Sequence, residues 1–195
     1  MTRARKKSGF TGVDEMLAPL FADSRRAIKA AATKRASGYS KRLAVRATFA
    51  LIEGMIHVQK QRALKHAKEM DYSPSELALL REESYRLNNR GDIDVVQSFL
   101  RVPENLLFAW KMARGADRSN FQIDLGSDGW RCLKESLKVR NRLTHPRSEQ
   151  DLEVSRDEIN ALLAAQLWVL ENEFQTIAAG MKHPRRLKGT GERGG

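Results

Sequence analysis

The stretch KRLAVRATFALIEGMIHVQKQRALKHAKEM, residues 41–70, decides the fold. Apolar residues recur in it every three or four positions, which is the period of an α-helix. One apolar stripe is widened by further apolar residues until most of the circumference is apolar. The stripe is Leu43, Ala47, Ala50, Leu51, Gly54, Met55 and Val58, and Phe49, Ile52 and Ile56 widen it. Because a helix of this kind must be covered by other helices, the stretch predicts the central helix of a bundle.

The sequence on either side is also helical in pattern. Residues 13–36 form an amphipathic segment with Pro19 near its start, and Ser40 is the expected cap of the central helix. Ser73 and Glu76 around Pro74 predict a capped helix over residues 73–88. Pro103 opens another helix.

Asp128 is the expected cap of a helix that runs to about residue 144, and Ser155 with Glu158 predicts a last helix to about Ile177. Residues 115–126 read as a loop in which Phe121, Ile123 and Leu125 alternate with polar residues. One strand alone cannot make a sheet, so we predict none. The expected fold is an all-α, up-and-down helical bundle of five to seven helices.

Charge divides the chain into three parts. The 195 residues include 35 Lys/Arg and 24 Asp/Glu, a net charge of +11. Residues 1–42 hold eleven of these cations and three acids, and the end of the chain is basic too, so the middle is nearly neutral. We expect a basic N-terminal helical extension at 1–39, the bundle at 40–178 and a flexible basic tail at 179–195. Basic ends suit a polyanionic partner such as nucleic acid, although a tail of this composition can also serve solubility alone.

Several function classes are excluded by composition. Cys132 is the single cysteine, which excludes an internal disulfide framework and a multi-cysteine zinc site. No His, Cys, Asp and Glu cluster has the spacing of metal ligands, and no glycine-rich phosphate loop is present, so neither a metal nor a cofactor is expected. No apolar run is long enough for a membrane span or a secretory signal. The sequence therefore predicts a cytoplasmic protein.

Residues 131–147, RCLKESLKVRNRLTHPR, form the densest basic stretch of the neutral middle, with six cations and one acid. Pro146 disfavours a helical conformation at His145, so this residue is expected just beyond the helix end. Arginine and histidine in a last helical turn commonly complement the helix dipole, and that alone explains most such patterns.

The pattern Arg140, Asn141 and His145, read as RNRLTHP, resembles the signature of the HEPN superfamily of all-helical domains. The segment FALIEGMIHVQKQRAL is similar to the first long core helix of these domains, so the resemblance covers roughly residues 40–178. It implies a metal-independent endoribonuclease that acts as a toxin or antiviral defence effector. It also implies a homodimer in which two copies join their motifs into one composite site, and a possible antitoxin or defence-complex partner.

The residue types suit that chemistry. Histidine exchanges protons near neutral pH, so His145 is the candidate acid or base. Arg140 would hold the scissile phosphate of RNA, and Asn141 would orient the histidine or contact the sugar. Further phosphate contacts are expected from Lys138, Arg142 and Arg147 of the same stretch. Trp130 is a candidate for base stacking.

Glu53 lies within the apolar run of the central helix, where a carboxylate is costly unless it is paired. It could position Arg140, but a buried ion pair within the core, with Arg46 or His57 near its face, is the favoured interpretation.

Two other functions remain open at this stage. One is a non-catalytic nucleic-acid or nucleotide-binding module, and the other is a helical partner subunit of a defence or toxin-antitoxin complex, with Trp168 at its interface.

Overall fold

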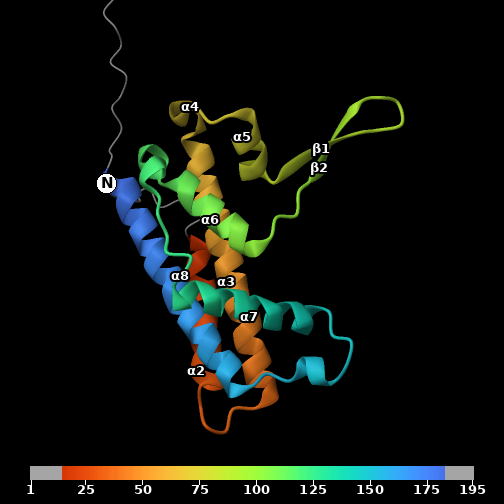
Figure 1. Cartoon of the computed structure of the whole chain (residues 1–195), viewed down its shortest axis with the longest axis vertical. Helices are drawn as coiled ribbons and strands as arrows, with labels where there is room; N and C mark the ends of the chain where they lie inside the picture. Colours follow the sequence, from red (N-terminus) through yellow and green to blue (C-terminus); the bar gives the residue numbers. More distant parts are fainter. Residues whose placement is uncertain (1–14, 183–195) are drawn as a thin grey trace, which may run out of the picture.

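The computed structural model describes residues 15–182, and these residues form a helical bundle from which one β-hairpin projects (Figure 1). The helices are α2 (Leu17–Ala31), α3 (Gly38–Lys65), α4 (Ala67–Met70), α5 (Pro74–Arg81), α6 (Val102–Ala113), α7 (Asp128–Thr144) and α8 (Arg156–Lys182). Short 3-10 turns lie at Gly115–Asn120 and Gln150–Leu152. The all-α class is confirmed. No helix of the described range is long and apolar enough to cross a membrane.

Helix α3 is the centre of the bundle, as its sequence predicts. It packs against α2, α5, α6, α7 and α8. Buried side chains surround most of the circumference of α3. The exception is an exposed stripe of Arg46, Ala50, Glu53 and His57, which are spaced four, three and four residues apart. The expectation that Leu43 and Ala50 belong to the core is therefore wrong, because both are exposed. This stripe leaves one side of α3 open to solvent beside α7.

Helix α2 belongs to the same core as the bundle. Ala27, Ile28 and Ala31 are buried in the main hydrophobic cluster together with residues of α3. Gly54 permits the close approach of the two helices, since a Cβ atom there would lie 2.6 Å from Cδ1 of Leu20. The predicted extension at 1–39 thus packs on the bundle over residues 17–31, while residues 1–14 lie outside the described residues. Helix α8 continues to Lys182, into the segment expected as the tail, and residues 183–195 are also outside the described range.

The prediction of no sheet is wrong. Strands β1 (Glu83–Leu87) and β2 (Ile93–Gln97) pair antiparallel, with Tyr85 opposite Val95 and Leu87 opposite Ile93. Helix α5 stops at Arg81, well before the expected Asn88, because Glu82 adopts the left-handed conformation at φ 59°. The turn closes through a hydrogen bond from Gly91 N to Asn88 O at 3.0 Å, and Gly91 has φ 82°. Tyr85 and Leu87 fall within the helix expected over residues 73–88, but they are instead cross-strand neighbours in the hairpin.

Candidate functional site

Helix α7 carries the motif and ends where its sequence predicts. Ser127, one residue before the expected Asp128, is the N-cap, and its side chain accepts a hydrogen bond from Trp130 N at 3.4 Å. The last helical residue is Thr144, and His145 is the C-cap with φ −129° and ψ 62°. Pro146 follows and directs the chain away from the helix.

Arg140 reaches across to the central helix. Its Nη2 donates a hydrogen bond to Oε1 of Glu53 at 2.9 Å, so that the motif helix and α3 are joined by an ion pair. The side chains remain 32% and 46% exposed, respectively. The favoured interpretation of Glu53 as a buried ion pair within the core is therefore wrong, because this carboxylate lies on the exposed stripe of α3. The alternative contact, between Glu53 and Arg140, is present.

The other two motif residues lie at the same end of α7. Asn141 accepts a hydrogen bond from Nη1 of Arg140 through Oδ1 at 3.3 Å. His145 is exposed, and its backbone N donates to Asn141 O at 3.1 Å. Thr144 Oγ1 donates to the carbonyl oxygen of Arg140 at 2.8 Å and steadies the last turn. Arg140 is thus oriented by two acceptors while its remaining N–H groups are available to a ligand.

The expected phosphate contacts differ from one another in the structure. Lys138 is exposed and pairs with Glu135 on its own helix at 2.9 Å. Arg147 is exposed, and its backbone N donates to Asp151 Oδ2 at 2.8 Å. That bond is the main reason why the pKa of Asp151 lies below its usual value. Both cationic side chains are exposed near the end of α7, but the ammonium of Lys138 is already paired with Glu135.

Arg142 is committed elsewhere, which corrects its expected role. It forms a forked ion pair with Glu158 of α8, at 2.8 Å and 3.0 Å, and also donates to the carbonyl oxygen of Glu153. Burial opposes the charged form of Glu158, but the hydrogen bonds from Arg142 and from Ser155 N outweigh it, so the pKa of Glu158 is lowered. Arg142 therefore fastens α7 to the start of α8 and is not free for phosphate.

Beside this ion pair lies a depression of about 370 Å³, lined by Arg142 and Glu158 together with Gln150, Glu153, Val154 and Ser155. Two of its side chains are carboxylates, which oppose an anionic ligand. The depression therefore does not extend the motif into a phosphate channel.

Trp130 is not available for base stacking, contrary to expectation. It is 9% exposed and packs against Trp168, with ring centroids 5.6 Å apart. Trp168 also meets Trp110 at 5.8 Å. These three indoles join α6, α7 and α8 within one chain, so Trp168, which one alternative placed at a subunit interface, packs at least in part inside the bundle.

Two buried charged residues escaped the sequence reasoning. Lys60 is 2% exposed, and its Nζ donates to Glu82 Oε1 at 2.9 Å and to Leu79 O at 3.1 Å. Burial lowers the pKa of Lys60. Glu173 accepts hydrogen bonds from Trp110 Nε1, at 2.6 Å, and from Gln59, while burial raises its pKa. The sequence indicated the burial of Lys60, because it lies four residues after Ile56 on the same apolar face of the helix. That spacing does not reveal that Glu82 is its partner.

The described residues contain no group of three or more His, Cys, Asp and Glu side chains that could hold a metal ion. What the motif end of α7 does offer is a guanidinium held in place, an exposed imidazole and two further exposed cations. Comparison of the chain with protein-family models, with curated proteins and with solved structures finds no match.

Proposed function

We propose that this protein is an HEPN-like, metal-independent endoribonuclease whose site is Arg140, Asn141 and His145. The observation that carries the proposal is the Glu53–Arg140 contact. It holds the motif arginine at the exposed end of α7, on the same short segment as an exposed histidine. An arginine that served only to cap α7 would need no carboxylate from another helix.

The reaction needs few protein groups, because RNA contains its own nucleophile. The ribose 2′-oxygen forms a bond to phosphorus while the bond from phosphorus to the 5′-oxygen breaks. A base accepts the 2′-hydroxyl proton and an acid supplies a proton to the leaving 5′-oxygen, which leaves a 2′,3′-cyclic phosphate and a 5′-hydroxyl. An imidazole can perform either transfer, each worth typically 10²- to 10⁴-fold in rate.

Arg140 would bind the phosphate with the N–H groups that Glu53 and Asn141 leave free. Its fixed positive charge offsets the negative charge that grows on the phosphate oxygens. Glu53 is a positioning residue in this scheme, since it contacts the arginine and not the RNA. Lys138 and Arg147 would hold neighbouring phosphates.

The single imidazole that each chain contributes to the proposed site covers one of the two proton transfers. A second copy that brings its own motif would supply the other, so the proposal includes a homodimer with a composite site. Light scattering of the purified protein should then give twice the chain mass of 22.1 kDa. We also propose that the protein acts as a toxin or antiviral effector and that an antitoxin or defence-complex partner inhibits it.

A non-catalytic nucleic-acid-binding module is the second candidate. It is favoured by the seven cations between Arg25 and Arg42, for which the described structure shows no acidic partner. Such a protein would bind RNA with strong salt dependence and release it intact.

Incubation of the full chain with RNA in excess chelator separates the two candidates. The proposal predicts products that end in 2′,3′-cyclic phosphate, formed by the wild type and by His57→Ala, a control at an exposed histidine of α3. It predicts none from Arg140→Ala. Intact RNA with the wild type, or cleavage that persists in Arg140→Ala, overturns the assignment.

A further inference from the structure

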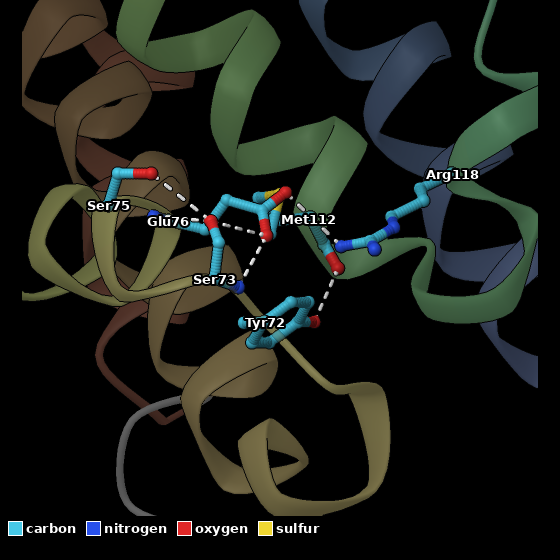
Figure 2. Close-up of polar contacts among 6 residues, drawn as sticks. All are labelled: Tyr72, Ser73, Ser75, Glu76, Met112 and Arg118. Atoms are coloured by element: carbon cyan, nitrogen blue, oxygen red, sulfur yellow. Dashed lines mark hydrogen bonds and ion pairs between the residues drawn. The ribbon is translucent and has the colours of Figure 1, made fainter.

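The cations of the described chain fall into two groups that differ in their partners. From Lys60 to Arg142, many are paired with carboxylates, as in Lys60–Glu82, Arg118–Glu76 (Figure 2) and Arg140–Glu53. Between Ser24 and Arg42 there are seven cations and no acidic residue, and within residues 15–182 none of the seven has a carboxylate partner. These seven are Arg25, Arg26, Lys29, Lys34, Arg35, Lys41 and Arg42. None of these cations is therefore held in an ion pair within residues 15–182.

Three cations meet around one cavity at the junction of α2, α3 and α8. This cavity has a volume of about 100 Å³, enough for one phosphate group, and Lys34, Lys41 and Arg156 line it. Thr33 and Asn160 add polar side chains, the other lining residues are Ala31, Ala32, Ala36 and Ile159, and no carboxylate is among them. We call the cavity with these three cations, together with the neighbouring first turn of α3 that carries Tyr39, the α2–α3 corner.

The rim of the cavity is partly fixed. Nζ of Lys41 donates to Val154 O at 3.0 Å, which holds this ammonium between α3 and the chain that leads into α8. Lys34 and Arg156 are exposed. Capping of α2 does not account for three cations, because the C-terminus of a helix carries only about half a negative charge.

An exposed aromatic side chain lies close in sequence to these cations, on a different face of α3 from Lys41. Tyr39 lies in the first turn of α3, two residues before Lys41, and is 65% exposed. Cations that follow a phosphate backbone, combined with an exposed aromatic ring on which a base can stack, are the features by which proteins bind single-stranded nucleic acid.

We infer that the α2–α3 corner binds single-stranded nucleic acid, with one backbone phosphate in the cavity of Lys34, Lys41 and Arg156 and one base stacked on Tyr39. That the strand is RNA rests on the proposed function, whereas the binding itself does not require cleavage. The corner is a separate site from the end of α7. It holds a strand by its backbone and contributes no group to the reaction.

The test uses a fluorescein-labelled single-stranded RNA of about 20 nucleotides in excess chelator, with fluorescence anisotropy as the readout. Lys34→Gln/Arg156→Gln removes two exposed cations and leaves the bond of Lys41 intact. Arg90→Gln/Lys111→Gln is the matched control, since it removes two exposed cations from the hairpin and α6.

The corner variant should bind at least about 10-fold more weakly at 150 mM salt, with the slope of log K against log salt reduced by about 1 to 2. The control should stay within about twofold. Tyr39→Ala, which keeps every charge, should weaken binding about 5-fold or more.

Failure of this inference and failure of the proposed function give different results. Equal losses in the corner and control variants overturn the inference, because they show that only net charge matters. Loss of binding to anionic lipid vesicles without loss of binding to RNA overturns it as well, in favour of a membrane surface. Corner-dependent binding of RNA that stays intact supports the inference and overturns only the nuclease assignment. If the nuclease assignment holds, cleavage of a dinucleotide should be unchanged in the corner variant, because a substrate of that length occupies the motif alone.

Discussion

At the scale of single residues, Glu53 gives Arg140 a fixed direction. A free arginine side chain samples many rotamers, and ordering it on binding costs entropy. The carboxylate on α3 and the amide of Asn141 order the guanidinium in advance. The ion pair is partly exposed, so its value for stability is small, on the order of 0–1 kcal/mol. Its main effect is expected on activity.

Glu53→Gln should therefore lower the RNA cleavage rate about 10-fold or more while leaving the melting temperature nearly unchanged, because misplacement of a catalytic group is costly. In an Arg140→Lys background the same change should cost less, since the hydrogen bond from Nη2 to Glu53 is already lost. Cleavage rates of the four proteins measure this coupling. Equal losses in both backgrounds contradict a positioning role.

Glu158 predicts how stability depends on pH. Its pKa is lower in the folded protein than the value of about 4.3 usual for unfolded chains. The stabilisation is therefore complete above pH 4.3 and is lost as the pH falls through the folded-state pKa. Glu158→Gln should cost about 1 kcal/mol at pH 7 and flatten the loss of stability toward pH 3, as measured by urea unfolding. Glu135→Gln, at an exposed pair with Lys138, is the control. An equally steep acid limb in Glu158→Gln contradicts this account.

At the scale of elements, α7 is placed by a close approach to α8. A Cβ atom at Gly129 would lie 2.3 Å from Cγ of Trp168 and 2.4 Å from its Cβ. The indole cannot move aside freely, because Trp110 and Trp130 pack on it. The glycine therefore sets the position of the helix that carries Arg140 and His145.

Gly129→Ala should destabilise the protein by about 1–3 kcal/mol through overpacking, although alanine normally favours a helix over glycine. Gly126→Ala, in the loop before α7, is the control and should change stability by less than about 0.5 kcal/mol. Urea unfolding measures both. A stabilised Gly129→Ala protein would show that helix propensity outweighs the contact.

Sequence reasoning succeeded where a residue's environment is local to the chain. The apolar run predicted α3 as the central helix, and Pro146 predicted the end of α7. It failed where a distant segment decides. The hairpin depends on the pairing of β1 with β2, and Arg142 finds its partner on α8. Glu53 lies on the exposed stripe of α3, which the spacing of Arg46, Ala50 and His57 already indicated. The sequence did not indicate that α7 lies beside this stripe and brings Arg140 to Glu53.

At the scale of the whole molecule, the cations that we assign to RNA lie at two positions within residues 15–182. One is the end of α7 with Arg140, Lys138 and Arg147, and the other is the α2–α3 corner. Both belong to the same bundle, because α2 and α7 each pack against α3. In the proposed enzyme the first position carries out the reaction and the second retains the strand.

The most direct test of the central claim is the RNA cleavage rate of His145→Ala in excess chelator, compared with the wild type at equal melting temperature. The account predicts a fall of at least about 100-fold because the proposed acid or base is removed. The fold should stay intact, because the His145 side chain is exposed beyond the helix end. An undiminished rate would contradict it.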